Sequence, residues 1–399
     1  IAKGVTLKSQ SSTPSNPQNG DMYYDSTLNK FRKYENGAWT LFDGSIPSQT
    51  NNSGKFLQTD GSSAQWSPVK TFRNKLINGA MQIDTDHVGA LISAPGSGKY
   101  VLDQWRLDRT QASKFDFQRN KNAVTPPNGF LNYMGAEVTA AYTPLAGDVF
   151  EVLQLIEGHD VADFSFGNAG AKTVTLSFWV RSSITGLHSG SLRGPSHAYP
   201  YTFTISAANT WEYKTVVIVG HTAGTWVIDY GVGILVSFNL GAGSTFLAAA
   251  GSWQAGTFVG ATGGVDVVAT VGATFYVTGA QLEIGNVATE FEVEPFSMLL
   301  ERCMRFYETP QNEDGAVQNF LAWSGNTTVS ETYYVTTFFQ VPKRVIPTMT
   351  TTNQDANGFV TTASGVGQIN RKGFRRNRAA NNSISAGYFG DDWVANARY

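Results

Sequence analysis

The sequence predicts an all-β protein with a small N-terminal β-meander, a central antiparallel jelly-roll sandwich, one short junction helix and a C-terminal β domain. Charged residues make up only 15% of the chain, against roughly 25% in an average globular protein. Aromatic residues reach 13%, and there are 41 glycines. Runs with a two-residue period recur between Gly, Asn and Pro, whereas only one stretch has helical spacing. These features favour short strands joined by tight turns.

Net charge and apolar content exclude several classes of protein. The formal net charge is −2, so no global field recruits nucleic acid or an anionic membrane. No apolar run approaches the roughly 20 residues of a membrane span, so membrane insertion is not expected. The single cysteine rules out an intrachain disulfide, and stability has to come from packing or oligomerisation. Because the chain begins at Ile1, we expect it to be processed or to continue a longer polypeptide.

Residues 1–44 are expected to form the β-meander. Three short aromatic runs, GDMYYD, KFRKYE and AWTLF, supply its strands. Asn36-Gly37 joins the last two runs and is the strongest two-residue hairpin signal, because both turn positions need positive φ. A meander of this size is not stable alone, so we expect it to serve in attachment or trimerisation. Residues 45–70 are polar and predict an extended connector, with GKFLQTDG as a short extended element.

Residues 71–292 form the largest predicted module, an antiparallel sandwich for which a jelly roll is the preferred form. The run Lys172–Arg181 alternates, with aliphatic and Phe side chains on one face and Thr, Ser and Trp179 on the other. The runs WEYKTVVIV, TWVIDY and TFYVTGAQLE are comparable, and Gly279 inside the last predicts a bulge. Repeated strands without a second helical pattern indicate a sandwich.

The junction segment, residues 293–308, is the stretch with helical spacing. Its apolar residues recur three, four and three positions apart, on one stripe of a helix: Phe296, Leu299, Cys303 and Phe306. Pro295 fits the first helical position, where a missing N–H costs nothing. Cys303 is then a small buried hydrophobe rather than a thiol nucleophile.

Residues 309–399 are again β-like. The runs ETYYVTTFFQVP and PTMTTTNQ have strand composition. The basic run NRKGFRRNR at 370–378 is expected to be a solvated or subunit-facing surface. Binding of phosphate or an acidic polysaccharide is the alternative for this run.

We found no catalytic constellation in the sequence, so we expect a protein that is not an enzyme. Five histidines are scattered without metal-ligand spacing, and PGSGKY at 95–100 fails the phosphate-loop pattern. A pair of carboxylates across a groove could hydrolyse a glycoside. Five acids are available for this, but we expect solvated acids at strand ends: Glu137, Glu151, Glu157, Asp160 and Asp163.

Asp103 is the candidate for a metal site. In YVLDQWRLD it shares an alternation face with apolar residues, and an inward carboxylate must be paired or bind a cation. Asp103 and Glu283 are therefore candidates for a structural calcium; otherwise no cofactor is expected. The preferred alternative is a buried hydrogen bond or an arginine partner, Arg106 or Arg109.

Three aromatic residues are candidates for glycan binding. Trp179 stands on the polar side of its strand, and HAYPYTF places Tyr199 and Tyr201 around a proline. Flat aromatic faces beside polar groups stack on sugar rings and also serve protein interfaces. A subunit interface is the preferred alternative for these residues.

The order of several motifs resembles that in tail fibres and fibre-like receptor-binding proteins of tailed bacteriophages. NGDMYYDSTLNKFRKYENGAWTLF is similar to the meander near fibre attachment regions, and SGKFLQTDGSSAQWSPV to a shaft connector. RNKLINGAMQID with YVLDQWR resembles the opening of a carbohydrate-binding-like jelly roll, and LSFWVRSS and YVTGAQLEIGNVATEFE its later strands. LLERCMRFYE and VPKRVIPTM are similar to the helix and C-terminal domain that follow. The resemblance covers nearly the whole chain.

The resemblance implies a homotrimeric virion protein on the tail or head surface. Its N-terminal region would join other virion proteins, its C-terminal domain would form the distal tip, and it would attach to host-surface glycans. The junction helix would pack on the jelly roll, on the C-terminal domain or on symmetry mates near a threefold axis. The alternatives are a collar, baseplate or head-decoration protein without glycan binding, a capsule or polysaccharide depolymerase spike, and a cellular carbohydrate-binding module.

Overall fold

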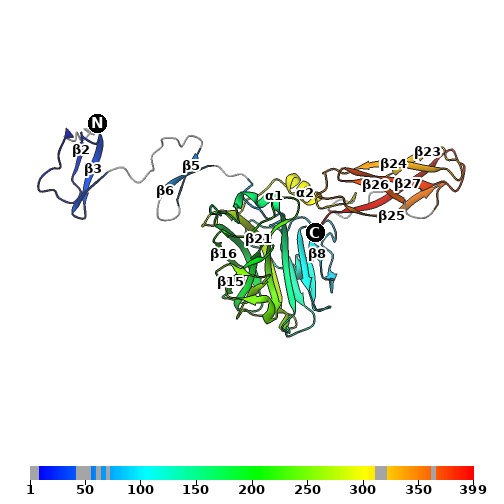
Figure 1. Cartoon of the computed structure of the whole chain (residues 1–399), viewed down its shortest axis with the longest axis horizontal. Coiled ribbons are helices and arrows are strands. Elements are labelled where there is room, and N and C mark those ends of the chain that lie inside the picture. The colour runs from blue at the N-terminus through cyan, green and yellow to red at the C-terminus, as the bar shows by residue number, and fades with distance from the viewer. Residues whose placement is uncertain (1–8, 42–54, 60–63, 69–71, 311–320, 361–364) are drawn as a thin grey trace. The chain divides into compact units, whose positions relative to one another are not determined.

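The computed structural model describes residues 9–41, 55–59, 64–68, 72–310, 321–360 and 365–399 (Figure 1). The chain divides into two compact units, Ile1–Thr71 and Phe72–Tyr399. Nearly all regular structure in the described residues is strand, which confirms the predicted all-β class. The junction helix and the C-terminal β domain belong to the same unit as the sandwich.

The first unit contains two small sheets. One has the order β1 (Ser9–Gln10), β2 (Met22–Asp25), β3 (Lys30–Glu35) and β4 (Ala38–Leu41). Asn36 and Gly37 connect β3 to β4 with φ of 50° and 81°, so the predicted two-residue hairpin is confirmed. The region predicted as an extended connector contains an antiparallel hairpin of β5 (Lys55–Thr59) and β6 (Ala64–Pro68).

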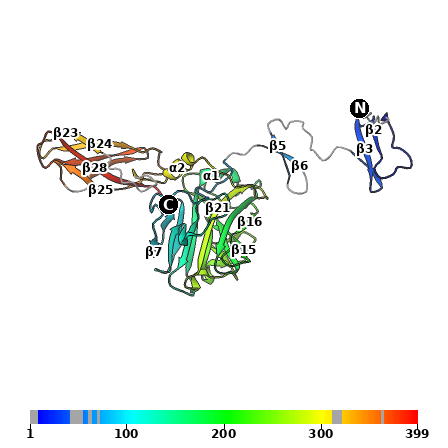
Figure 2. The same ribbon diagram turned by 180° about the vertical axis from the view of Figure 1, so that it is seen from behind.

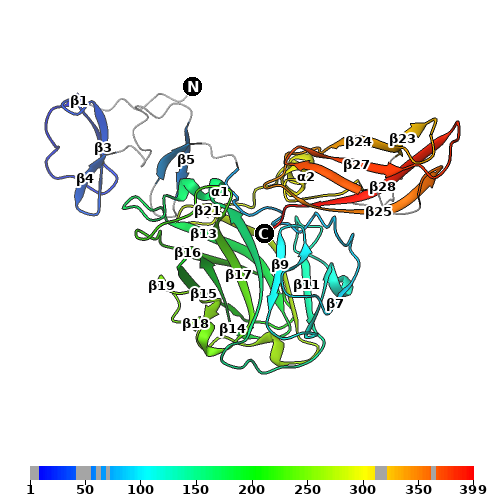
Figure 3. The ribbon, with the colours of Figure 1, turned by 45° about the vertical axis from the view of Figure 1, so that its right-hand side comes forward.

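Two antiparallel sheets make the sandwich of the second unit (Figure 3). The six-stranded sheet has the order β16 (Glu212–Ile218), β13 (Val174–Ser182), β21 (Thr274–Ile284), β11 (Met134–Val138), β10 (Phe115–Arg119) and β7 (Ile92–Ser93). The seven-stranded sheet has the order β19 (Gln254–Ala255), β15 (His197–Ile205), β14 (Gly186–Arg193), β17 (Val232–Ala242), β12 (Val149–Glu157), β9 (Trp105–Arg109) and β8 (Lys99–Leu102). The inner faces meet in one large hydrophobic core.

The core is built from the alternating side chains of these strands. Phe238 of β17 lies against Trp105 of β9 and against Phe178 of β13, with ring centroids 6.1 and 5.0 Å apart. The apolar positions predicted for β13 are all buried in this core. Thr175 and Ser177 on the opposite face of β13 are buried as well, and Thr175 donates a hydrogen bond to the Gly285 carbonyl, just after β21, at 2.9 Å.

Gly279 forms the predicted bulge in β21. The register against β13 shifts at this point, and Gly279 has a φ of 60°. A Cβ at this position would lie 2.6 Å from the ring of Phe130. Both the backbone conformation and the close ring therefore require glycine here.

Short elements complete the sandwich. They are η1 (Lys121–Ala123), α1 (Gly158–Val161), η2 (Ala162–Phe164), η3 (Ser244–Phe246), β18 (Leu247–Ala248), β20 (Gly260–Ala261) and η4 (Val267–Ala269). β18 and β20 pair in parallel, and β20 contacts β14, β15 and β17. β20 contacts three strands of the seven-stranded sheet without being hydrogen-bonded into it. The segment 243–262 therefore covers part of the outer face of that sheet.

The junction helix is α2 (Phe296–Met304), with Pro295 as its N-cap rather than its first helical residue. Leu299, Cys303 and Phe306 are buried in a cluster with Ile77 and Ile83, so the helix packs on the opening segment of the sandwich module. The predicted stripe was wrong at Phe296, which is 48% exposed, because the contact surface begins one turn later, at Leu299. Burial raises the pKa of the Cys303 thiol, as expected of a structural cysteine.

The C-terminal β domain has two sheets (Figure 2). In one, β28 (Gly387–Asn396) pairs with β22 (Tyr307–Glu308), β23 (Leu321–Gly325) and β25 (Thr348–Asn357). In the other, β27 (Gly373–Ala379) lies between β24 (Thr332–Phe338) and β26 (Gly365–Asn370). The predicted strand runs ETYYVTTFFQVP and PTMTTTNQ correspond to β24 and β25.

The basic run 370–378 was predicted to be a solvated or subunit-facing surface, and the solvated part of that prediction is wrong for two of its arginines. Lys372 is exposed, but Arg376 and Arg378 of β27 are buried. Both form ion pairs with the buried Asp391 of β28. Alternation along β27 turns these two arginines inward, and the aspartate balances their charge.

The end of the chain returns to the sandwich, where the C label lies beside β8 (Figure 1). The Arg398 guanidinium lies 3.1 Å from Asp86 and 3.4 Å from Asp103. The Tyr399 main-chain N–H donates to the Tyr100 hydroxyl at 3.3 Å. Arg305, just after α2, forms an ion pair with Glu157 of β12 at 2.7 Å. Both ends of the C-terminal β domain are therefore fixed to the sandwich.

Candidate functional site

A polar hollow lies on the outward face of the seven-stranded sheet. Trp105 and Leu107 of β9 and Phe150 and Val152 of β12 are in the core. Strand alternation therefore turns the intervening side chains outward. These are Arg106 and Asp108 of β9 and Glu151 of β12, and Glu151 lies directly opposite Asp108 in the register.

The cavity above these side chains has a volume of about 470 Å³. We call it the arginine hollow, and it is lined by Ser97, Gly98, Arg106, Asp108, Arg109, Thr110, Val149, Glu151, Arg193, Phe246, Thr257 and Val259. Residues from β9, β12 and β14 form its polar part. The segment 243–262, which covers the neighbouring part of the sheet, supplies the last three residues.

Ion pairs fix the polar side chains of the arginine hollow. The Arg193 Nη2 atom lies 2.5 Å from Glu151 Oε2, and these residues are only 8% and 3% exposed. The Arg106 Nη2 atom lies 2.6 Å from Asp108 Oδ2, while Arg106 Nη1 donates to the Tyr399 main-chain oxygen at 3.4 Å. Side chains held in this way are pre-organised for a ligand.

Several N–H donors of the arginine hollow are unused within the described residues. The Nε atoms of Arg106 and Arg193 are buried without a hydrogen-bond partner. Arg109 donates its Nε–H to the Pro95 carbonyl at 2.6 Å, and the structure gives its two Nη groups no partner among the described residues. A buried donor without a partner costs about 1–3 kcal/mol. The Nε atoms of Arg106 and Arg193 are shielded from solvent, so the Nη groups of Arg109 are the unused donors that a ligand oxygen can reach.

One side of the arginine hollow is apolar. Val149 and Val259 are buried in a small cluster against which Phe246 packs. Phe246 is half-buried, so part of its side chain remains accessible. Fixed donors and acceptors beside an apolar wall suit a sugar, which presents hydroxyl groups at its edge and C–H groups on its faces.

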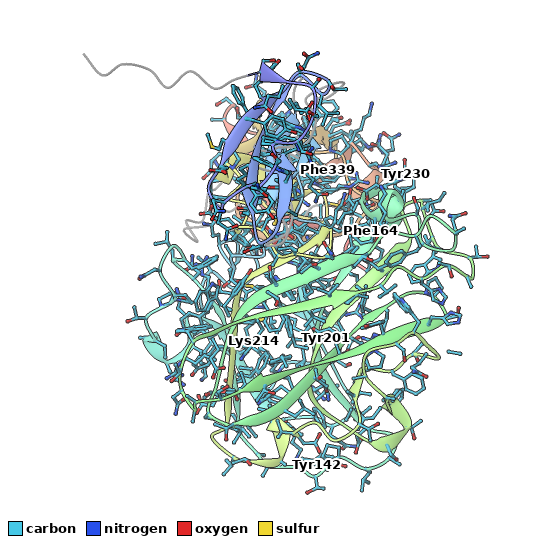
Figure 4. The ribbon with its side chains drawn as sticks, turned by 90° about the vertical axis from the view of Figure 1, so that its left-hand side faces the viewer. Tyr142, Phe164, Tyr201, Lys214, Tyr230 and Phe339 are labelled. Carbon is cyan, nitrogen blue, oxygen red and sulfur yellow. The ribbon has the colours of Figure 1, made fainter. Side chains whose placement is uncertain are left out.

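The structure places the predicted glycan-binding aromatics elsewhere. Trp179 is half-buried on β13 of the six-stranded sheet, with its ring 5.4 Å from that of Tyr213. Tyr199 and Tyr201 are both in the hydrophobic core. Tyr201 is 1% exposed, lies within the strands of the sandwich (Figure 4) and donates its hydroxyl to the Ser237 carbonyl at 2.8 Å. Alternation along β15 turns both tyrosines inward, so their rings are not available to stack on a surface sugar.

The two calcium candidates have separate partners. Asp103 is fully buried; it accepts the Thr85 main-chain N–H at 2.6 Å and lies beside Arg398. Its partner is thus an arginine from the chain end, not the expected Arg106 or Arg109, and desolvation raises its pKa although Arg398 opposes this. Glu283, on the other sheet, accepts hydrogen bonds from Gln281 and Thr289. Among the described residues, no three His, Cys, Asp or Glu side chains lie together as metal ligands.

Most of the acids that the sequence offered for glycoside hydrolysis face a cation. The ion pairs are Glu137 with Lys121, Glu151 with Arg193, Glu157 with Arg305 and Asp163 with Lys75. Glu151 and Glu157 are buried, so the expectation of solvated strand-end acids was wrong for these two. Asp160 is exposed, and partial desolvation by the surrounding residues raises its pKa.

The arginine hollow was not predicted from the sequence. Arg106 and Arg109 were expected only as partners of Asp103, and no role was predicted for Arg193. The available signal was the alternation of Arg106 and Asp108 with Trp105 and Leu107 along one strand, in a chain with few charges. Arg193 carries no such local signal, because it meets Glu151 only through the fold.

Comparison with known proteins gives structural similarity alone. No protein-family model matches the chain, and no curated protein matches its sequence. One similar structure is the enzymatically active domain of tailspike protein 4 of bacteriophage CBA120, with 14% identity over 55% of this chain and 22% of that chain and a TM-score of 0.30.

Two carbohydrate-binding modules are similar to the same extent. The module TmCBM61, in complex with β-1,4-galactotriose, has 10% identity over 53% of this chain and 99% of its own, with a TM-score of 0.27. The xylan-binding CBM22-1 domain of Paenibacillus barcinonensis Xyn10C has 9% identity over 55% and 99%, with a TM-score of 0.24. Scores this low carry no functional argument, so the assignment of a function rests on the arginine hollow.

The described helices are also all too short or too polar to cross a membrane.

Proposed function

We propose that this chain is a virion fibre protein of a tailed bacteriophage and that it binds host-surface glycans through the arginine hollow. The observation that carries the binding role is a cavity lined by three arginines and two carboxylates beside an apolar wall, on the outward face of a β-sandwich. The order of the sequence motifs supports the virion role.

Each part of the arginine hollow has a role in this proposal. Arg106, Arg193 and Arg109 donate hydrogen bonds to sugar oxygens. Glu151 and Asp108 accept hydrogen bonds from sugar hydroxyls, and Phe246 packs against the C–H face of the ring. The proposed binding needs no cofactor and no covalent step.

A glycan array tests the binding role. The intact chain should bind a subset of surface glycans, and Thr257→Trp should weaken that binding at least tenfold, or about 1.4 kcal/mol, because Thr257 is an exposed residue at the wall of the arginine hollow. Thr204→Trp is the matched control: Thr204 is an exposed threonine on β15 of the seven-stranded sheet and does not line the cavity.

Three results would contradict the proposal. Equal binding by the two tryptophan variants would place the glycan elsewhere. A blank array, with virions that still adsorb when the protein is blocked, would favour a collar, baseplate or head-decoration protein. Release of reducing sugar from host capsule, abolished by Glu151→Gln, would replace the binding role with that of a depolymerase.

The assembly part of the proposal is a homotrimer, joined to other virion proteins through its N-terminal region. We expect a trimeric mass by size-exclusion chromatography with light scattering, both for the intact chain and for residues 71–399. A trimer that needs residues 1–70 would make the N-terminal unit the clamp. A monomer in both preparations would refute self-assembly.

A further inference from the structure

We infer that the arginine hollow selects glycans that carry a carboxylate group. The inference rests on the proposed function and names the ligand class of the same site. It follows from how the charged groups of the cavity are already used. Three guanidinium groups line the cavity against two carboxylates.

Both carboxylates already have an arginine partner. Glu151 is paired with Arg193 at 2.5 Å, and Asp108 with Arg106 at 2.6 Å. The guanidinium left over is that of Arg109, for which no ion pair is found among the described residues. The cavity therefore contains one positive charge in excess.

The geometry of Arg109 suits a planar anion. Its main-chain N–H donates to Ser97 Oγ at 3.0 Å, and its Nε–H donates to the Pro95 carbonyl at 2.6 Å. The second bond fixes the plane of the guanidinium and leaves its two Nη groups as a free fork. Such a fork binds a carboxylate through two parallel hydrogen bonds, which a single sugar hydroxyl cannot reproduce.

A nearby acid does not compete for this fork. Asp148 accepts hydrogen bonds from Thr110 at 2.7 Å, Gln111 at 3.0 Å, Tyr142 at 2.7 Å and the Leu145 N–H at 2.9 Å. These bonds hold its pKa well below the usual range. The negative charge of Asp148 reduces the positive potential at the edge of the cavity, near Thr110. Both carboxylate oxygens of Asp148 already accept hydrogen bonds, however, and Asp148 does not line the cavity.

The test compares acidic oligosaccharides, containing uronic or sialic acid, with the same oligosaccharides after reduction of each carboxyl to a hydroxymethyl group. We expect the acidic forms to bind at least tenfold more tightly. Arg109→Gln should weaken binding of the acidic forms far more than binding of the reduced forms, and so remove this preference. The substitution leaves no buried acid unpaired, so the variant should fold.

Arg181→Gln is the matched control. Arg181 is a half-buried arginine on the other sheet whose Nε–H also donates to a main-chain carbonyl, that of Asn209 at 2.9 Å. This variant should keep the preference for acidic forms. Equal binding of acidic and reduced forms, or a preference that survives Arg109→Gln, would overturn the inference.

The two proposals fail in different ways. Neutral glycans that bind and are blocked by Thr257→Trp, without a preference for acidic forms, would overturn the inference and leave the proposed function standing. Binding to neither acidic nor neutral glycans would overturn both.

Discussion

Replacing Lys343 with methionine should destabilise the C-terminal β domain by about 3–5 kcal/mol, the usual cost of leaving a buried charge unpaired. Lys343 is 0% exposed, and its Nζ lies 2.5 Å from Glu308 Oε2. It also donates to the Val341 carbonyl at 2.8 Å and to the Met304 carbonyl at the end of α2. The ammonium group thus joins the helix, β22 and the loop after β24.

The magnitude follows from what remains after the substitution. Methionine fills a similar volume, so the loss comes from the charge rather than from a cavity. The carboxylate of Glu308 stays buried and, among the described residues, keeps the Gln340 main-chain N–H, at 2.9 Å, as its donor. Burial lowers the pKa of Lys343 although Glu308 opposes this, so desolvation of the ammonium costs free energy. Removing both charges should therefore recover most of the loss.

The assay is equilibrium urea unfolding of the wild type, of Lys343→Met and of the double variant Lys343→Met/Glu308→Gln. We expect the single variant to lose several kcal/mol and the double variant to lie much closer to the wild type. A single variant that loses less than about 1 kcal/mol, or a double variant as unstable as the single, would refute the reasoning.

The remaining predictions concern packing, backbone and pH. Leu299→Asp should destabilise the fold by at least about 3 kcal/mol and abolish soluble assembly, since it buries a charge. Phe296→Asp, on the exposed side of α2, should change the free energy of unfolding by less than about 0.5 kcal/mol. Thermal melts and soluble yield distinguish the two variants, and equal effects would disprove the packing of the helix. Gly279→Ala should destabilise the protein by at least about 1 kcal/mol more than Gly272→Ala in the same melts. Both glycines have positive φ, but nothing lies within 4 Å of a Cβ at Gly272. Equal losses of stability in the two variants would mean that backbone strain is the whole effect. Burial lowers the pKa of His188 below 6.5, so the unfolded chain binds more protons and stability falls as the pH drops below 6.5, by at most about 1.4 kcal/mol per pH unit. His188→Phe should flatten that part of the pH profile, and an unchanged slope would rule the histidine out.

Local patterns predicted the strands because alternation and turn chemistry are local. The two-residue turn before β4, the apolar face of β13 and the bulge at Gly279 each follow from a few neighbouring residues. The class of fold could therefore be predicted from the sequence.

An alternating pattern shows which residues of a strand share a face, but it does not show which of the two faces is buried. HAYPYTF shows that Tyr199 and Tyr201 share a face, but the partners of β15 decide that this face is the core. In β27, likewise, Arg376 and Arg378 share a face, and the buried acid that turns them inward, Asp391, lies on another strand.

The arginine hollow could not be predicted for the same reason. Arg193 and Glu151 are 42 residues apart, and only the order of strands β14, β17 and β12 brings them together. The unused donor of Arg109 depends on a carbonyl 14 residues earlier, which holds the Nε–H. Ion pairs between distant strands leave no periodic signal in a single sequence.

The return of the chain end to the sandwich has a mechanical consequence. Tyr307 and Glu308 leave α2 paired with Asn396 and Ala395, so the chain enters and exits the C-terminal β domain through adjacent strands. A pulling force on the far end of that domain would divide between the covalent chain at Arg305 and the ion pairs that Arg398 forms with the sandwich. Both strands would be loaded in the same direction, so their hydrogen bonds would not be peeled open one after another. The domain would therefore be held to the sandwich at two points rather than at one, and it would resist bending at its base.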